Sequence, residues 1–366
     1  MKPRSRLLLT SDAVGGVWTY SLDLAASLGA ADDLAIVLAT LGPPPSPEQM
    51  DRASAIPGLQ LVETGLPLDW TATNEQELRA AAAALTDLAK QAQADLVQLH
   101  APALACADFT VPVVSVVHSC VATWWAAVRG TALPDDFAWR TRLTTEGLQR
   151  SDLVAAPSRA FAEAVQQTYA LEHSPVAVHN GRTRLHFPPT QPSCHAFTAG
   201  RLWDEGKNVA ILDRAAALAS ASFRAAGPTR GPNGAEIALE HAQALGLLSE
   251  DELAAEFASQ PVFVSPTVYE PFGLSVLEAA QAGCALVLSD IPTFRELWDG
   301  VAVFVDPLDP QAIAAAVDRL AAAPDERRRL GASARERSAR FTPEATARAM
   351  LAQYRDLLGD ERRVAA

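Results

Sequence analysis

The chain has 366 residues, which predicts about two domains at roughly 150 residues each. Hydrophobic residues make up 49% and charged residues 20% of it, so global disorder is excluded. The formal net charge is −13, and a chain this acidic has no general attraction for nucleic acid. Its four cysteines are far apart and form no CxxC pair, which indicates neither a zinc site nor a disulfide framework.

The N-terminal segment MKPRSRLLLT has too few consecutive apolar residues for the core of a signal peptide. No stretch approaches the about 18 apolar residues that a membrane-spanning helix needs. We therefore expect a cytoplasmic protein without a transmembrane segment.

Short runs rich in Val, Leu and Ile alternate with helical stretches along the first half. Such near-continuous runs are typical of strands buried on both faces of a parallel sheet, and Thr19–Ala30 and Asn74–Ala94 are expected helices between them. The predicted strands are Leu7–Thr10, Leu34–Thr40, Leu59–Glu63, Leu96–His100, Val113–His118, Leu153–Ala156 and Val176–His179.

The second half repeats this alternation after a proline-rich linker at residues 186–194. Both halves are therefore predicted to be doubly wound α/β domains, and the tail from Thr342 to about Leu358 an amphipathic helix. The predicted strands are His195–Ala199, Ser222–Ala226, Val262–Ser265, Ala285–Ser289 and Val301–Val305. The predicted helices are Lys207–Ser220, Gly234–Leu245, Ser249–Ser259, Gly273–Ala282 and Pro310–Ala323.

Two adjacent glycines, Gly15 and Gly16, separate the first predicted strand from a helix. Backbone N–H groups at such a turn can approach an anion closely, and a helix N-terminus favours negative charge. The alternative is a tight turn without a ligand. The run is not GxGxxG, and the second strand ends at Thr40 without an acidic residue for a ribose, which disfavours a nicotinamide dinucleotide.

Two predicted strands of the first half end in a histidine, at His100 and His118. A neutral imidazole at a strand end can hydrogen-bond a hydroxyl or carry a proton, and the alternative is a polar cap on the sheet. Neither has a CxxC or HExxH neighbourhood, so metal ligation is not expected. Trp124 and Trp125 follow near the same edge, where they would either stack on a sugar or bury surface.

Arg201 and Lys207 flank a turn in the second half, with Lys207 at the expected start of the next helix. A cation there opposes the helix dipole unless an anion is bound. An arginine fork and a compact lysine charge suit a diphosphate. The alternative is an ion pair with Asp204 or Glu205.

The segment EPFGLSVLE carries Glu270 on a loop and Glu278 inside the helix that follows. The N–H groups of Gly273–Ser275 begin that helix and form a ready anion site. Two carboxylates flanking an anion site make sense if each accepts hydrogen bonds from the hydroxyls of a ribose or a hexose.

EPFGLSVLE resembles the E-x7-E motif of the retaining glycosyltransferases of family 4. That family has the α/β GT-B fold, with two Rossmann-like doubly wound domains facing a central cleft. The resemblance covers nearly the whole chain, because the glycine pair, His118, Asn180–Gly181, GRL…KN and ELWDG…FVDP follow in the family's order. It implies an acceptor-side domain at 1–187, a donor domain at 188–341, and a helix at 342–366 that crosses back to the first domain.

The resemblance also implies an activity, the transfer of a hexose from a UDP-, GDP- or ADP-sugar to an unknown hydroxyl acceptor. The configuration at the sugar would be retained, with no metal or other cofactor. Arg201 and Lys207 would neutralise the diphosphate, Glu270 would contact the transferred sugar, and His118 would lie against it near the anomeric carbon. Since no DxD-type ligand set is apparent, the positive charge would come from these cations and from helix dipoles.

Further residues would hold the donor, with Glu278 on the ribose hydroxyls and the base near Gly227 and Leu245–Leu248. The donor-binding residues implied are Gly15, Gly16, Asn180, Phe272, Gly273, Leu274, Ser275 and Glu278. The chain departs from the family pattern at Arg182, at Cys284–Ala285 and in the short GPTRGPNG stretch, which leaves the nucleotide open.

Two other classes stay open on the same scaffold. One is a nucleotide-sugar-binding protein without turnover, although Arg201, Lys207 and Glu270 are all present. The other is a sugar-nucleotide epimerase or a phosphorylase. Epimerisation needs further acid and base residues that are not identifiable, and cofactor-dependent phosphorolysis needs a Schiff-base lysine.

Overall fold

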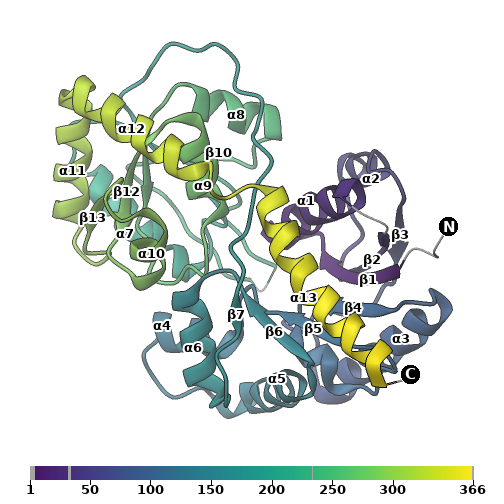
Figure 1. Ribbon diagram of the computed structural model, residues 1–366. Coiled ribbons are helices and arrows are strands. Elements are labelled where there is room, and N and C mark those ends of the chain that lie inside the picture. Colours follow the sequence, from purple (N-terminus) through teal and green to yellow (C-terminus); the bar gives the residue numbers. More distant parts are fainter. Residues whose placement is uncertain (1–4, 32–33, 233, 365–366) are drawn as a thin grey trace. The chain divides into compact units, whose positions relative to one another are not determined.

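The computed structural model describes residues 5–31, 34–232 and 234–364 (Figure 1). The chain divides into two compact units. The first comprises Met1–Ala126, Gly130–Arg182 and Thr342–Ala366, and the second comprises Ala127–Arg129 and Thr183–Phe341.

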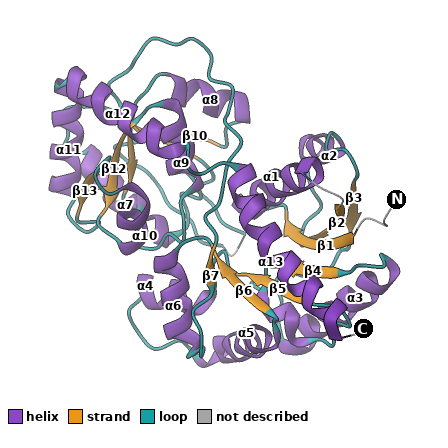
Figure 2. Ribbon diagram, in the orientation of Figure 1, coloured by secondary structure: helices purple, strands orange, loops and turns teal. Residues whose placement is uncertain are grey.

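The first unit is built on a parallel sheet with the strand order β3-β2-β1-β4-β5-β6-β7 (Figure 2). This is a doubly wound order, and it reverses direction between β1 and β4, where ligands bind in such sheets. The strands are β1 (Ser5–Asp12), β2 (Leu34–Leu41), β3 (Leu59–Glu63), β4 (Leu96–Leu99), β5 (Val113–Val116), β6 (Leu153–Ala156) and β7 (Val176–Ala177).

Helices and short 3-10 turns connect these strands. Serine and asparagine caps begin several of them, as at Asn74, whose side chain accepts the N–H of Glu77. The elements are α1 (Gly16–Ala31), α2 (Pro47–Ser54), α3 (Glu75–Gln91), η1 (Pro102–Cys106), α4 (Val121–Val128), η2 (Asp135–Phe137), α5 (Ala138–Arg150), α6 (Arg159–Tyr169) and α13 (Pro343–Val364).

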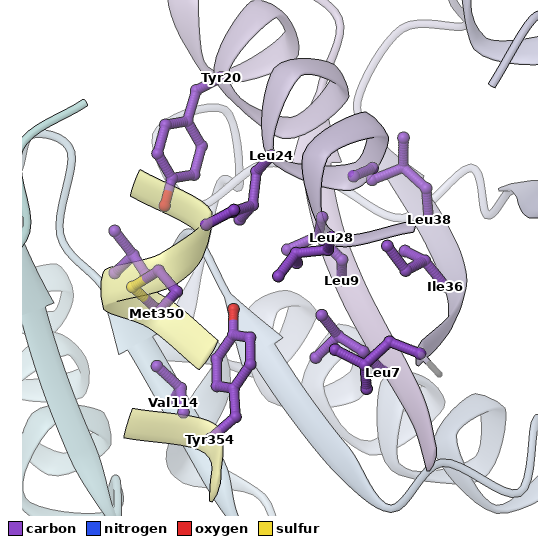
Figure 3. Packing of buried hydrophobic residues seen from close by; sticks show 14 of the residues in the cluster. Leu7, Leu9, Tyr20, Leu24, Leu28, Ile36, Leu38, Val114, Met350 and Tyr354 are labelled. Carbon is purple, nitrogen blue, oxygen red and sulfur yellow. The ribbon is translucent and has the colours of Figure 1, made fainter. Parts of the chain in front are cut away.

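The last helix, α13, packs on the first unit, although more than 150 residues separate it from the rest of that unit. Met350 and Tyr354 of α13 are buried in one cluster with Leu24 and Leu28 of α1 and with Leu9 of β1 (Figure 3). The apolar face of α13 thus covers α1 and one face of the sheet, and its burial gives this helix its stability.

The second unit has a parallel sheet with the strand order β10-β9-β8-β11-β12-β13, which reverses direction between β8 and β11. Its strands are β8 (Ala196–Ala199), β9 (Phe223–Ala226), β10 (Gln243–Gly246), β11 (Val262–Ser265), β12 (Ala285–Ser289) and β13 (Val303–Val305). Its other elements are η3 (Glu205–Lys207), α7 (Val209–Ala216), α8 (Glu250–Ala258), α9 (Leu274–Ala282), α10 (Pro292–Trp298), α11 (Pro310–Ala322) and α12 (Pro324–Ser338).

The prediction of a helix at Gly234–Leu245 is wrong. Residues 234–242 form an irregular loop, and β10 pairs in parallel with β9 at the edge of the sheet. Asp213 of α7 accepts the backbone N–H groups of Glu240, His241 and Ala242 at 2.8–3.1 Å. A carboxylate that fixes successive N–H groups competes with helix formation, and the sequence pattern did not reveal this contact across the chain.

The described helices include none that is long and apolar enough to span a lipid bilayer.

Candidate functional site

Lys207 and Glu270 meet at the point where the sheet of the second unit reverses direction. Lys207 follows β8 and Glu270 follows β11, and these two strands are neighbours. The Lys207 Nζ atom lies 2.5 Å from Glu270 Oε2, and both side chains are mostly buried. A parallel sheet places the ends of its strands at one edge, so residues far apart in the chain form a single charged pair there.

Backbone contacts hold the two loops together. The carbonyl of Gly206 accepts the N–H of Val268 at 2.9 Å and the hydroxyl of Thr267. Asn208 has the left-handed φ of 54°, and its amide donates to the carbonyls of Pro266 and Pro307 at 2.9 and 2.7 Å. The lysine is therefore presented on a loop whose position is set by several hydrogen bonds.

Lys207 does not begin a long helix, contrary to expectation. It ends the one-turn η3, and α7 starts at Val209 after Asn208. The reason is the left-handed Asn208, which interrupts the helical path, and its side-chain amide stabilises that conformation. The helix expected from Lys207 therefore starts two residues later, and Lys207 lies just before its N-cap.

Arg201 lies two residues after the end of β8, and its guanidinium pairs with the Asp204 carboxylate at 3.0 Å. The sequence analysis gave this ion pair as the alternative to a diphosphate site. Its side chain is 46% exposed. Asp204 also accepts the N–H of Gly206, so this carboxylate shapes the turn as well as pairing with Arg201. An exposed guanidinium in such a pair is available to a second anion.

The loop that carries Glu270 leads into α9 at Gly273. Gly273 has a φ of 95°, and a Cβ atom there would lie 3.1 Å from the ring of Phe294, so both backbone and space favour glycine. The N–H groups of Gly273–Ser275 stand at the helix start. Glu278, two turns into α9, is 9% exposed, and the Phe272 side chain packs in the core against Phe341.

The first unit places its own candidate groups where its sheet reverses direction. Gly15 and Gly16 connect β1 with α1, and Asp12 Oδ1 accepts the N–H of Val14 at 2.9 Å. His100 follows β4, the neighbour of β1. The N-terminus of α1 and the end of β4 thus share one edge of the sheet.

His118, His100 and Tyr20 form a ring cluster at this edge. The ring centroid of Tyr20 lies 4.5 Å from that of His118 and 5.3 Å from that of His100, and the two imidazoles are 4.8 Å apart. Burial lowers the pKa of His118 to about 3, and burial followed by the proximity of His118 lowers the pKa of His100. Both imidazoles are neutral at ordinary pH, so they can hydrogen-bond but carry no charge.

Asn180 and Gly181 lie in an irregular segment after β7, beside the start of α13. Asn180 is buried, and its Oδ1 atom has no partner among the described residues. A Cβ atom at Gly181 would lie 2.1 Å from the carbonyl of Thr342, which requires glycine there. Arg182, where the chain departs from the family pattern, forms a buried ion pair with Asp23 of α1 at 3.3 Å.

The two tryptophans of α4 contact each other, with ring centroids 6.3 Å apart. Trp125 also contacts Phe137, and its Nε1 donates to the hydroxyl of Thr131 at 3.2 Å. Both rings are partly exposed, so neither is fully buried in the core of the first unit.

Three further groups escaped the sequence analysis. Burial raises the pKa of Asp69, in the loop after β3, to about 6, and its pocket is also lined by Cys120 and Arg140. Gln98 and Tyr354 are buried and hydrogen-bonded to each other. The only signal for Gln98 was a glutamine inside the otherwise apolar run LVQL.

Within residues 5–31, 34–232 and 234–364, no three His, Cys, Asp or Glu side chains gather in a way that could hold a metal ion. Metal-independent chemistry therefore stays a prediction of the family resemblance.

Two family models match the chain. Residues 14–182 match the model described as Glycosyltransferase Family 4, and residues 194–323 match the one described as Glycosyl transferases group 1. The two matches fall on the two units and account for most of the chain. The chain therefore belongs to the glycosyltransferases of family 4, and its two-domain α/β fold is the GT-B fold.

Curated relatives are similar over short segments. The MMP alpha-(1->4)-mannosyltransferase of Mycolicibacterium hassiacum is 39% identical over 25% of this chain and 23% of its own length. The D-inositol 3-phosphate glycosyltransferase of Frankia alni is 38% identical over 30% of this chain and 27% of its own length. The similar segments thus span about a quarter of these relatives.

Solved structures are similar over almost the whole chain. A sucrose-phosphate synthase from Thermosynechococcus elongatus has a TM-score of 0.78 at 19% identity, covering 98% of this chain and 100% of its own. Anabaena HepE in complex with UDP-glucose has a TM-score of 0.74 at 17% identity, covering 96% of this chain and 100% of its own. At such identities the likeness shows the fold.

Proposed function

We propose that the protein transfers a hexose from a nucleotide-diphosphate sugar to a hydroxyl acceptor, with retention at the anomeric carbon and without a metal. The observation that carries this proposal is the Lys207–Glu270 pair. It lies on the loops that follow the neighbouring parallel strands β8 and β11, where the strand order reverses, and Glu270 precedes the N-terminus of α9. A lysine, an exposed arginine and free helix N–H groups together suit a diphosphate.

Each charged group of the second unit has a proposed role. The bond between the sugar's anomeric carbon and the diphosphate oxygen breaks, and the electron pair leaves with the diphosphate. Lys207, Arg201 and the N-terminus of α9 stabilise that developing charge. Glu270 accepts hydrogen bonds from the sugar hydroxyls, and Glu278 accepts those from the ribose.

In the first unit we assign His118 to the transferred sugar. Its neutral imidazole can hydrogen-bond a hydroxyl without placing a positive charge next to an oxocarbenium-like centre. The acceptor oxygen attacks from the face that the diphosphate leaves, and its proton passes to the departing phosphate oxygen. Such a step retains the configuration and needs no carboxylate nucleophile, unlike retaining glycosidases.

A nucleotide-sugar donor is supported by the HepE structure, which contains UDP-glucose. Which nucleotide this chain takes depends on the region near Gly227 and Leu245–Leu248. The loop at 234–242 fixed by Asp213 lies in the same stretch, where a helix was expected. We place the base near Gly227 and Leu245–Leu248, at the carboxyl ends of β9 and β10, and this loop precedes β10.

The test is thermal unfolding with saturating UDP, GDP or ADP, followed by the corresponding sugar conjugates. A ligand at about 100 times its Kd adds about 2.7 kcal/mol of stability, which raises the Tm by several degrees. We expect one nucleotide to do this and its sugar conjugate to be consumed with an acceptor. The anomeric configuration of the product, read by NMR, then decides retention. The absence of a shift with every nucleotide would contradict the proposal.

A further inference from the structure

Gln98 is a fully buried amide in the middle of the first unit's sheet. It lies on β4 between β1 and β5, and its relative exposure is 0%. A buried amide in an apolar strand is costly unless its oxygen and nitrogen find partners. Those partners show what the residue does.

Three polar side chains surround this amide. Its Oε1 accepts the hydroxyl of Tyr354 from α13, and its Nε2 lies 2.8 Å from Nε2 of His100. Burial raises the pKa of Tyr20, and the nearby Gln98 amide offsets part of that rise. Figure 3 shows both tyrosines in the buried cluster, one from α1 and one from α13.

The hydrogen bonds around His100 define its tautomer. The hydroxyl of Ser21 donates its single proton to the carbonyl of Val17 at 2.7 Å, so its oxygen is left to accept from Nδ1 of His100 at 3.3 Å. His100 therefore carries its proton on Nδ1. Its Nε2 accepts from the amide nitrogen of Gln98, and the Tyr354 hydroxyl holds that amide in the required orientation.

The fixed ring of His100 in turn touches His118. The two imidazoles meet edge to face, with centroids 4.8 Å apart and an interplanar angle of 89°, and Tyr20 contacts both rings. The Nε2 atom of His118 has no hydrogen-bond partner among the described residues. The Nε2 atom therefore does not fix the orientation of His118 through a hydrogen bond, and the ring contacts with His100 and Tyr20 contribute to that orientation.

We propose that Gln98 and Tyr354 are positioning residues, which hold His100 as its Nδ1–H tautomer and through it orient His118. This inference rests on the proposed function, because it is there that His118 is assigned to the transferred sugar. It makes the terminal helix part of the machinery, because Tyr354 lies on α13 and acts on β4. The helix α13 thus packs against α1 and also supplies a hydrogen bond that orients Gln98.

The principal variant is Gln98→Glu. A carboxylate at this position takes the Nε2–H of His100 and so reverses the tautomer. We expect kcat to fall about 10- to 100-fold, with the KM for the donor little changed, because misplacing a group by about 1 Å has such an effect. Tyr354→Phe keeps the ring and the packing, and we expect a smaller loss of kcat in the same direction.

Thr86→Val is the matched control. Thr86 is a buried residue of α3 in the same unit, and its hydroxyl donates only within its own helix. We expect its kcat to equal that of the unmodified protein. A loss of kcat in this control as large as in Tyr354→Phe would mean that any buried hydroxyl matters, which overturns the positioning role.

A second readout does not need turnover. The 15N NMR signals of His100 should show a protonated Nδ1 and an unprotonated Nε2, with the pattern reversed in Gln98→Glu, where the His118 signals should also move. An Nε2-protonated His100 in the unmodified protein, or unmoved His118 signals in both variants, would overturn the inference. If the unmodified protein neither binds a nucleotide nor transfers a sugar, the proposed function fails, and these signals still decide the tautomer and the orientation.

Discussion

The ammonium group of Lys207 has two kinds of partner in the proposed reaction cycle. Without a ligand it pairs with Glu270, and both side chains are largely shielded from water. A diphosphate brings a stronger negative charge, so it competes for the lysine and frees the glutamate for sugar hydroxyls. The pair thus keeps both groups satisfied until the donor arrives.

We predict that Lys207→Ala and Glu270→Ala each reduce kcat by at least about 100-fold, since removing one preorganised charge-stabilising donor costs about 3–4 kcal/mol. Turnover with the identified nucleotide-sugar is the measurement, with circular dichroism to confirm folding. Lys90→Ala is the control, because Lys90 lies exposed on α3. Near-normal turnover in a folded Lys207 or Glu270 variant would contradict the assignment.

The low pKa of His118 leads to a second prediction at the residue scale. In the unfolded chain this histidine takes up a proton below about pH 6.5, whereas in the folded chain it stays neutral down to about pH 3. Because only the unfolded chain binds this proton, the free energy of unfolding decreases as the pH falls from about 6.5 to about 3. Urea unfolding of His118→Phe should depend less on pH between about 6.5 and 3 than that of the unmodified protein. An equal dependence would contradict the shift.

At the scale of elements, a buried ion pair connects the irregular segment at 180–182 to α1. The side chains of Arg182 and Asp23 are 4% and 10% exposed, and they join the segment that carries Asn180 to α1, the helix that begins at Gly16. The departure from the family pattern at Arg182 thus has a structural explanation, because this arginine links two candidate donor-binding segments within the first unit.

We predict that Arg182→Met destabilises the protein by about 3–5 kcal/mol, because it removes one charge of a buried pair and leaves the other. The double variant with Asp23→Leu should recover part of this loss. Urea unfolding measures both, and Arg328→Met is the control, since that exposed pair should contribute no more than about 1 kcal/mol. A single-variant loss as small as the control's would refute the buried role.

At the scale of the whole molecule, the chain end returns to the first unit. Met350 of α13 is fully buried in the cluster that includes α1 and the first strand. We predict that Met350→Ala lowers the free energy of unfolding by about 2–5 kcal/mol through the cavity it leaves. Arg348→Ala, on the exposed side of the same helix, should change it by less than about 0.5 kcal/mol. Equal effects of the two would argue against docking of α13.

Much of this architecture was predictable from the sequence, because local signals and burial agree. The apolar runs at Leu7–Thr10 and Val262–Ser265 became β1 and β11, and the helix after Gly273 begins within one residue of its expected start. The loop at 234–242 was not predictable, since Asp213 fixes it across the chain. The composition of this segment favours a helix, but the hydrogen bonds from residues 240–242 to Asp213 hold it as a loop.

The sequence by itself determined the doubly wound α/β class, the E-x7-E segment and the residue types that suit a diphosphate. The fold class follows from hydrophobic periodicity and from glycine and proline positions, which act over a few residues, whereas the E-x7-E segment is identified by its resemblance to the family. Only the tertiary structure decided that Lys207 pairs with Glu270 rather than with Glu205. It alone brought Gln98, His100 and Tyr354 into one network. The physical reason is that the edge of a parallel sheet and the docking of a terminal helix join residues whose separation along the chain carries no local signal.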